Sequence, residues 1–367
     1  MFDLETLQVI WWALICVLFI SFMLTNGFDT GIGIILPFAA KTDTERRILI
    51  NVLAPHWDGN QVWLVLAIGA VFAAWPVIYG TAFSLFYFPL MLALFCLFFR
   101  PLGFDYRGKI DDPRWRGFWD WGIFVGSAFP TFFLGLIIGN LYIGLPFSMD
   151  EFHRALVSTT FISLFNPFSI LSGVFCTSLL VMHGASYSTL RTDDALNNQL
   201  IRFIKMGSLI ALISFVLMGL MLWQFMDGIV LNADNQVASV KAGWLNNYSV
   251  HPDLIFAPIA GLLGLAMAYL FSAKSPLLAF FSSCVAIIGA VITASGSLFP
   301  FVVPSSISLQ DSLTIFNGSS STYALTVMSW AAAFFVPVIF IYTAWCYKQL
   351  WGKLTARFIH ENDHSLY

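Results

Sequence analysis

Long apolar stretches separated by short polar connectors are the dominant pattern along the chain. A helix rises 1.5 Å per residue, so crossing the roughly 30 Å hydrocarbon core of a bilayer takes about 20 apolar residues. Nine stretches have this character, and the pattern predicts nine transmembrane helices. The predicted spans lie near residues 8–36, 49–75, 79–99, 118–142, 159–183, 203–226, 254–273, 277–300 and 322–346.

The basic residues test this count independently. Lys and Arg collect in the cytoplasmic loops of membrane proteins. Here all of them except Arg154 and Lys241 lie in alternate connectors, after the first, third, fifth and seventh spans, or in the tail after the ninth. The alternation predicts an all-α, polytopic membrane helix bundle with a periplasmic N-terminus and a cytoplasmic C-terminus. We expect residues 1–367 to form a single integral membrane domain.

Composition agrees with this class and excludes others. Hydrophobic residues make up 59% of the 367 residues and charged residues only 10%, which is too apolar to coat a soluble globule. A net charge of -3 without any Lys/Arg run argues against nucleic-acid binding. The five cysteines stand in apolar runs without C-x-x-C spacing, so we expect buried hydrophobes and no metal site. The N-terminus lacks a basic segment, which favours a retained first helix over a cleaved signal peptide.

A polar cluster interrupts the second predicted span. His56, Trp57, Asp58 and Gln61 fall within the stretch PHWDGNQVW. A carboxylate near a bilayer centre costs roughly 2.5–3.5 kcal/mol on insertion scales, so such groups normally face a protein interior or an aqueous path and act on ions, protons or substrate. We expect Asp58 to be buried with a partner and the cluster to be functional.

Asp29 lies inside the first predicted span, at a depth comparable to that of Asp58. Asp29 precedes Lys41 by 12 residues, and Asp58 follows Arg47 by 11. In helices, each carboxylate is therefore roughly 16–18 Å from a cytoplasmic basic residue. Two carboxylates on adjacent helices are expected in the inner half of the membrane, although Asp29 can equally be a residue that caps a packed helix.

A second constellation lies at the cytoplasmic end of the third span, where Arg100, Asp105 and Lys109 occur. Asp105 and Lys109 are four residues apart and can pair if this stretch is helical. An exposed charged pair beside a deeper carboxylate is suited to a proton entry path. The alternative is a solvated loop that only orients the protein in the membrane.

Six motifs in order resemble subunit II of the cytochrome bd-type quinol oxidases of bacterial respiratory chains. The resemblance runs from the first helix to the terminal HSLY. The motifs are TNGFDTGIG (25–33), APHWDGNQVW (54–63), FFRPLGFDYR (98–107), RWRGFWDWGIF (114–124), SLFPFVVPSS (297–306) and YTAWCY (342–347).

The resemblance implies a complex in the bacterial cytoplasmic (inner) membrane. Such a complex oxidises ubiquinol at the outer face and reduces O2 to water with cytoplasmic protons, which generates proton motive force without pumping. The implied partners are the haem-bearing subunit I, quinol, membrane lipid and, in some complexes, a small single-helix subunit. Haem b and haem d are expected on subunit I, with none in this chain, and some relatives hold a structural quinone in subunit II.

Histidine content agrees with a chain that carries no haem. Only His56 and His183 lie within or at the edge of a predicted span, too few to ligate a set of haems. The alternative to a chain without haem is that His56 acts as a haem ligand.

The resemblance also implies roles for individual residues. Asp58, Asp105 and Lys109 match positions along a cytoplasmic proton route, and Trp63 matches a position near a hydrophobic O2 path. Asp29 and Arg100 match motif positions and are expected to support the polar cluster.

A function from another class is a proton-coupled secondary transporter with Asp29 and Asp58 as its coupling pair. The sequence offers no detectable inverted repeat in its favour.

Overall fold

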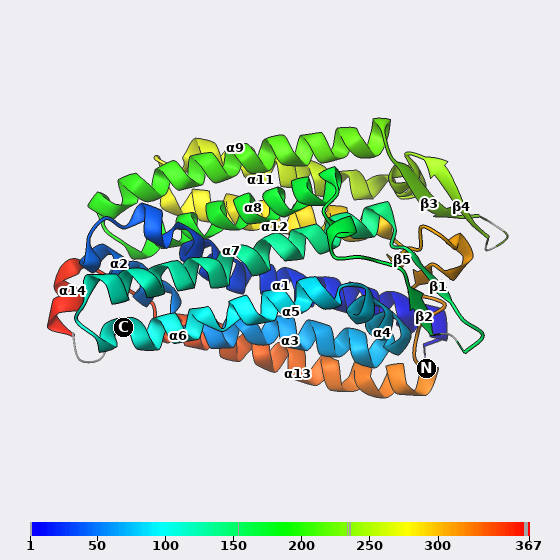
Figure 1. Cartoon of the computed structure of the whole chain (residues 1–367), viewed down its shortest axis with the longest axis horizontal. Helices are drawn as coiled ribbons and strands as arrows, with labels where there is room; N and C mark the ends of the chain where they lie inside the picture. The colour runs from blue at the N-terminus through cyan, green and yellow to red at the C-terminus, as the bar shows by residue number, and fades with distance from the viewer. Residues whose placement is uncertain (1, 153, 233, 235, 363–365) are drawn as a thin grey trace.

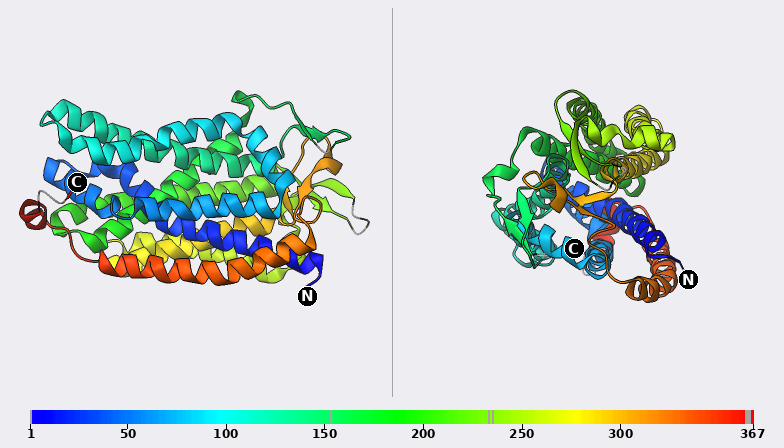
Figure 2. Two further views of the ribbon diagram at one scale, coloured as in Figure 1. Left: turned by 90° about the horizontal axis from the view of Figure 1, so that it is seen from below. Right: turned by 90° about the vertical axis from the view of Figure 1, so that its right-hand side faces the viewer.

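Long helices run side by side along the longest axis of the molecule, and the chain ends lie at opposite ends of it (Figures 1 and 2). The computed structural model describes residues 2–152, 154–232, 234, 236–362 and 366–367. The α-helices are α1 (Leu4–Ala39), α2 (Asp43–Leu53), α3 (Trp57–Ala74), α4 (Pro76–Leu85), α5 (Tyr87–Leu97), α6 (Phe99–Tyr106), α7 (Pro113–Ile143), α8 (Pro167–Arg191), α9 (Asp194–Gln224), α10 (Asn247–Val250), α11 (Phe256–Phe271), α12 (Pro276–Leu298), α13 (Thr322–Gln349) and α14 (Ala356–Glu361).

Within the described residues, nine helical segments are long and apolar enough to cross a membrane, which confirms the predicted number. One of them joins α5, α6 and the 3-10 turn η1 (Arg107–Lys109), and another joins the turn η4 (Pro252–Ile255) to α11. The other 3-10 turns are η2 (Ile162–Leu164), η3 (Gly243–Leu245) and η5 (Leu309–Asp311).

The second, third and fifth predicted spans illustrate how the observed boundaries differ from the predicted ones. The second, 49–75, is two helices, because α2 ends at Leu53 and α3 begins at Trp57 after a turn that contains Pro55. Proline has no N–H and clashes with the preceding turn, so it breaks the helical ladder. The third starts at Tyr87 instead of 79, since α4 is a separate short helix. The fifth predicted span was 159–183, whereas the observed helix, α8, is Pro167–Arg191.

The start of α8 shows how local sequence sets these boundaries. Pro167 occupies the first turn, where a missing N–H is harmless. Asn166 caps the helix and accepts from the backbone N–H of Ser169, whose hydroxyl in turn accepts from Asn166. The predicted span, which was based on apolar residues alone, began at residue 159 and so included residues that precede this cap.

Short antiparallel strand pairs lie at the end of the bundle that carries the N-terminus (Figure 1). The nine-helix prediction did not include them. They are β1 (Phe147–Met149) with β2 (Ala155–Val157), β3 (Asp227–Leu231) with β4 (Val237–Lys241), and β5 (Phe301–Val303) with β6 (Leu313–Thr314).

Small residues let the central helices approach closely. A Cβ on Gly31 of α1 would lie 1.9 Å from the carbonyl oxygen of Leu180 in α8, and one on Gly135 of α7 would lie 2.5 Å from that of Ser172. Backbones can pack this tightly only where side chains are absent, as at small-residue interfaces of other membrane helices. α8 is therefore the central helix against which α1 and α7 pack.

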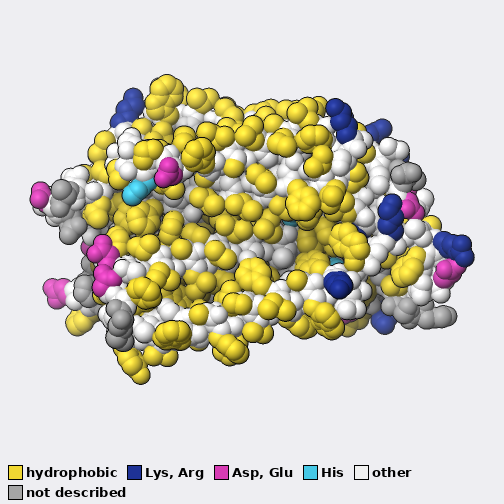
Figure 3. Space-filling view, turned by 180° about the vertical axis from the view of Figure 1, so that it is seen from behind, with side chains coloured by type: hydrophobic (Ala, Val, Ile, Leu, Met, Phe, Trp, Pro, Cys, Tyr) yellow, Lys and Arg dark blue, Asp and Glu magenta, His cyan; other side chains and the backbone are white. Residues whose placement is uncertain are grey.

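The outer surface is suited to lipid. Figure 3 shows hydrophobic side chains across the middle of one face, with most charged side chains near the two ends. α13 is an extreme case: Leu325 is the only residue of this helix that is buried.

Candidate functional site: a buried polar cluster where α3 begins

The turn between α2 and α3 lies well away from the end of the bundle along its long axis. Asn60, in the first turn of α3, donates from Nδ2 to Oδ2 of Asp29 at 2.7 Å. Asp29 lies ten residues before the end of α1 at Ala39, which is about 15 Å along that helix. The polar stretch that begins at Pro55 therefore lies well inside the end of α1, consistent with the depth expected from sequence.

Two buried residues form the centre of a hydrogen-bonded chain. Asp29 is 0% exposed and Asn60 2% exposed. The Oδ1 of Asn60 accepts from the Tyr347 hydroxyl at 2.6 Å. This chain joins α1, α3 and α13 through side chains that the sequence places far apart.

A second branch reaches the third span. Asn26 of α1 donates to Oε1 of Gln61 at 2.5 Å and accepts from Nη1 of Arg100 at 3.2 Å. Arg100 is 2% exposed, so the alternative that placed it in a solvated loop is wrong. Among the described residues, Asp29 Oδ1 and the Arg100 Nε and Nη2 atoms are buried without a hydrogen-bond partner. The cluster can thus hold charge and accept further polar partners.

The two carboxylates differ in burial, and the expectation for Asp58 is not met. Asp58 is exposed on this chain, whereas Asp29 is buried. Helical residues advance by about 100° each, so Asp58 and Asn60 point to nearly opposite sides of α3. Because Asn60 faces the bundle, Asp58 faces outward, and the prediction that Asp58 would be buried is wrong for this chain taken alone.

Asp105 and Lys109 are both exposed, and no ion pair joins them within the described part of the chain. The predicted pairing fails because α6 ends at Tyr106 and the chain continues as a 3-10 turn, which changes the i,i+4 geometry. Both residues nevertheless line one polar cavity of about 380 Å³, together with Asp43, Arg116 and others.

An ion-pair network beside this cavity was missed from sequence. Asp120 of α7 is 1% exposed and accepts from Arg107 Nε at 2.6 Å and from Arg46 Nη1 at 2.8 Å. Arg107 also reaches Asp43 at 2.7 Å. The sequence did contain an indication of this network, because a carboxylate near the start of a membrane span, such as Asp120, needs a cationic partner. Its partners could not be assigned without the fold.

The aromatic residues of the cluster pack tightly. Trp63 is 1% exposed and lies 4.7 Å from the Phe340 ring, so it is a packed indole and does not face lipid. Trp57 is half-buried. His56 stacks on Tyr347 with ring centroids 4.5 Å apart and planes 8° apart, and its buried Nε2 has no hydrogen-bond partner among the described residues.

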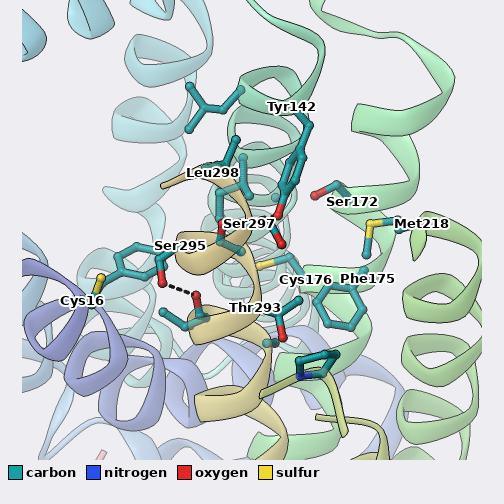
Figure 4. A pocket seen from close by; sticks show the side chains of 18 of the residues that line it. Cys16, Tyr142, Ser172, Phe175, Cys176, Met218, Thr293, Ser295, Ser297 and Leu298 are labelled. Carbon is teal, nitrogen blue, oxygen red and sulfur yellow. Dashed lines mark hydrogen bonds between the residues drawn. The ribbon is translucent and has the colours of Figure 1, made fainter. Parts of the chain in front are cut away.

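A separate cavity of about 570 Å³ lies toward the strand-bearing end. Its wall is largely apolar, and Figure 4 shows the polar atoms of Tyr142, Ser295 and Ser297 among its lining. The Tyr248 hydroxyl is 2.9 Å from the hydroxyl of Ser297. Burial raises the pKa of Tyr248 above its ordinary value, which keeps the phenol protonated.

A family model described as "Cytochrome bd terminal oxidase subunit II" matches residues 7–350. The chain belongs to this family. Membership confirms the resemblance seen in the six motifs.

Subunit II relatives match along almost the whole chain. It is 42% identical to "Cytochrome bd-I ubiquinol oxidase subunit 2" of Escherichia coli (strain K12), with 100% of both chains covered. It is 43% identical to "Probable cytochrome oxidase subunit 2" of Haemophilus influenzae, again with 100% of both covered. It is 34% identical to "Cytochrome bd ubiquinol oxidase subunit 2" of Bacillus subtilis, over 94% of this chain and 96% of that one.

A solved structure shares the fold of this subunit II. A chain of bd oxidase from Geobacillus thermodenitrificans matches with a TM-score of 0.69 at 12% identity, covering 94% of this chain and 98% of that chain. With the nine apolar helices, these findings make the chain a multi-pass inner-membrane subunit of a bacterial respiratory bd oxidase.

Proposed function

We propose that this chain is the non-haem companion subunit of a quinol oxidase that couples ubiquinol oxidation to the reduction of O2 to water. In this proposal its 367 residues act as one membrane domain with a periplasmic N-terminus and a cytoplasmic C-terminus. The chain supplies a proton path from the cytoplasm to the haems of subunit I. The observation that carries the proposal is the exposed carboxylate of Asp58 at membrane depth.

A carboxylate facing lipid at this depth is unfavourable by roughly 2.5–3.5 kcal/mol. Its place in the first turn of α3 offsets part of that cost, because helix N-termini favour negative charge. Full relief requires a polar partner. We infer that subunit I covers this face of α3 and receives protons from Asp58.

The cytoplasmic mouth would be the polar cavity that contains Asp105 and Lys109. Both side chains are exposed and can exchange protons with bulk water. Arg107, between them in sequence, is held by Asp120 and Asp43, so the rim is fixed while its two charged neighbours remain accessible. Asp29, Arg100, His56, Trp57 and Gln61 would support the relay.

Haem b and haem d are assigned to subunit I. Among the described residues no group of three or more His, Cys, Asp or Glu side chains could hold a metal ion. Both ring nitrogens of His183 are engaged, at 2.8 Å with Ser283 and at 2.9 Å with the Leu24 carbonyl. His56 is packed under Tyr347, so neither of these two histidines within the membrane-spanning region fits a haem ligand.

The 570 Å³ cavity is suited to a structural quinone. Its apolar wall matches an isoprenoid tail, and hydroxyls such as those of Tyr142 and Ser297 could meet the carbonyls of a head group. Trp63 is proposed to border an O2 path, since it lies in a buried apolar position on α3.

Purification through a tag on this chain tests the proposal. A haem-containing partner should copurify, and the visible spectrum should contain haem d bands. A colourless monomer that takes up protons together with a substrate would instead establish the transporter alternative, against which the family match over residues 7–350 already argues.

A further inference from the structure

The first turn of α3, which carries Asp58, has little support of its own. It follows a helix break at Pro55, and the side chain of the N-cap residue His56 makes no hydrogen bond to its free backbone N–H groups. An uncapped helix end frays unless tertiary contacts hold it. Here the contacts come from Asn60 to Asp29 and from Gln61 to Asn26.

The Asn60 amide has a defined direction. A carboxylate can only accept, so Nδ2 of Asn60 must face Asp29, which leaves Oδ1 as an acceptor for the Tyr347 hydroxyl. The Tyr347 ring also stacks on His56, the residue immediately before α3. Tyr347 thus contacts both the residue preceding α3 and the amide that anchors its first turn.

Polar contacts also hold α13 near its two ends, and Phe340 packs against Trp63 of α3 between them. Toward the N-terminal side of the bundle, Trp11 Nε1 donates to the Leu325 carbonyl at 3.2 Å and to the Ser329 hydroxyl at 3.0 Å. At the other end, Arg191 donates to the carbonyl oxygens of Leu350 and Gly352, just beyond the helix. Between lipid-facing helices, hydrogen bonds matter because apolar burial adds little association energy. Among the described residues, the Tyr347 hydroxyl supplies the hydrogen bond that joins this outer helix to the Asn60–Asp29 pair.

We propose that Tyr347 is a positioning residue that, through Asn60, fixes Asp29 and the first turn of α3 so that Asp58 is oriented for proton transfer. This inference rests on the proposed proton-delivery function. Tyr347 itself does not transfer the proton in this scheme. Its hydroxyl donates one hydrogen bond, and its ring covers His56.

Tyr347→Phe in the complete oxidase complex removes the hydroxyl and keeps the ring stack. One intramolecular hydrogen bond corresponds to a change of about two- to tenfold. We expect quinol-driven oxygen reduction at saturating quinol to fall by about that factor, with the quinol KM and the haem d content per complex unchanged. The deficit should grow as pH rises, because proton delivery limits turnover more when protons are scarce. Tyr342→Phe, on the 63% exposed neighbour in the same helix, is the matched control and should behave as wild type.

A double-mutant cycle with Asn60→Ser identifies the route of the effect. If both residues act through one chain of hydrogen bonds, the double variant should lose no more turnover than Asn60→Ser alone. Additive losses would overturn the proposal. So would a wild-type pH profile in Tyr347→Phe, or a loss of turnover that only follows loss of haem d.

Asp58→Asn in the same assay distinguishes failure of the positioning role of Tyr347 from failure of the proton route through Asp58. If Asp58→Asn slows turnover and Tyr347→Phe does not, the positioning role alone fails. If Asp58→Asn has no effect, the proposed proton route fails, and a slow Tyr347→Phe variant would then overturn the positioning role as well, since that role acts through Asp58.

Discussion

Asp120→Asn should destabilise the complex markedly, because one carboxylate neutralises two guanidinium groups at the end of the bundle that carries α2 and α14. Asp120 is 1% exposed, and the side chain of Arg107 is 5% exposed and that of Arg46 29% exposed. Removing one partner of a buried ion pair typically costs about 3–5 kcal/mol, since it leaves an uncompensated charge. Arg107 keeps Asp43 at 2.7 Å, and Arg46 is partly solvated, so we expect the lower part of this range, about 3 kcal/mol.

Thermal unfolding of the purified complex in detergent, followed by intrinsic fluorescence, measures this effect. For a chain of this size the expected loss corresponds to a fall in apparent Tm on the order of 5 °C. Scan rates must match, because such complexes unfold irreversibly.

Asp111→Asn is the control for this experiment. Asp111 is 94% exposed and, among the described residues, forms an ion pair with Arg116 alone, at 2.7 Å, so its loss should change stability by less than about 1 kcal/mol. An unchanged Tm in Asp120→Asn, or equal shifts in both variants, would refute the claim that the buried network holds this end of the bundle together.

Three further outcomes are expected. Gly31→Ala should destabilise by at least ~1–3 kcal/mol in a thermal scan, because its Cβ would meet a carbonyl oxygen of α8 at 1.9 Å, whereas Gly69→Ala, with nothing within 4 Å, should not. Asp29→Asn combined with Arg100→Leu should cost less than the two single losses added together, measured as haem d content and Tm, because the two buried groups interact electrostatically and each single change leaves the other without the opposite charge. The β1–β2 hairpin should loosen in acid: the backbone N–H four residues on lowers the pKa of Asp150, so its contribution is present above the ordinary carboxyl pKa and is lost as pH falls through the lowered one. Hydrogen exchange of the hairpin amides, corrected for intrinsic rates and compared with Asp150→Asn, checks this.

Apolar length and the placement of basic residues were enough to predict nine spans. The same patterns could not show that the second span is broken, because the average hydrophobicity of 49–75 hides the separate helical ladders on either side of Pro55. They also could not show that 79–85 belongs to its own helix, or that Asn166 delays the start of α8.

The structure agrees with the predicted depth of the polar cluster, but the predicted burial of Asp58 was wrong for this chain. The distances along the chain from the cytoplasmic basic residues predicted that Asp29 and the start of α3 lie at a similar depth in the membrane. The Asn60–Asp29 hydrogen bond confirms this. Which face of α3 points inward depends on the partners it meets. Asn26, Asn60 and Tyr347 come from three helices, and no local pattern indicates that they converge. In the proposed function, subunit I covers the exposed Asp58, and a single sequence does not show which face of α3 such a partner covers.

Oxygen reduction by a purified complex that carries Asp58→Asn tests the central claim most directly. If Asp58 passes protons to subunit I, turnover should fall while the haem d absorbance per complex stays at the wild-type level. Wild-type turnover with normal haem d would contradict that role, and loss of haem d together with turnover would show that Asp58 holds the subunits together instead.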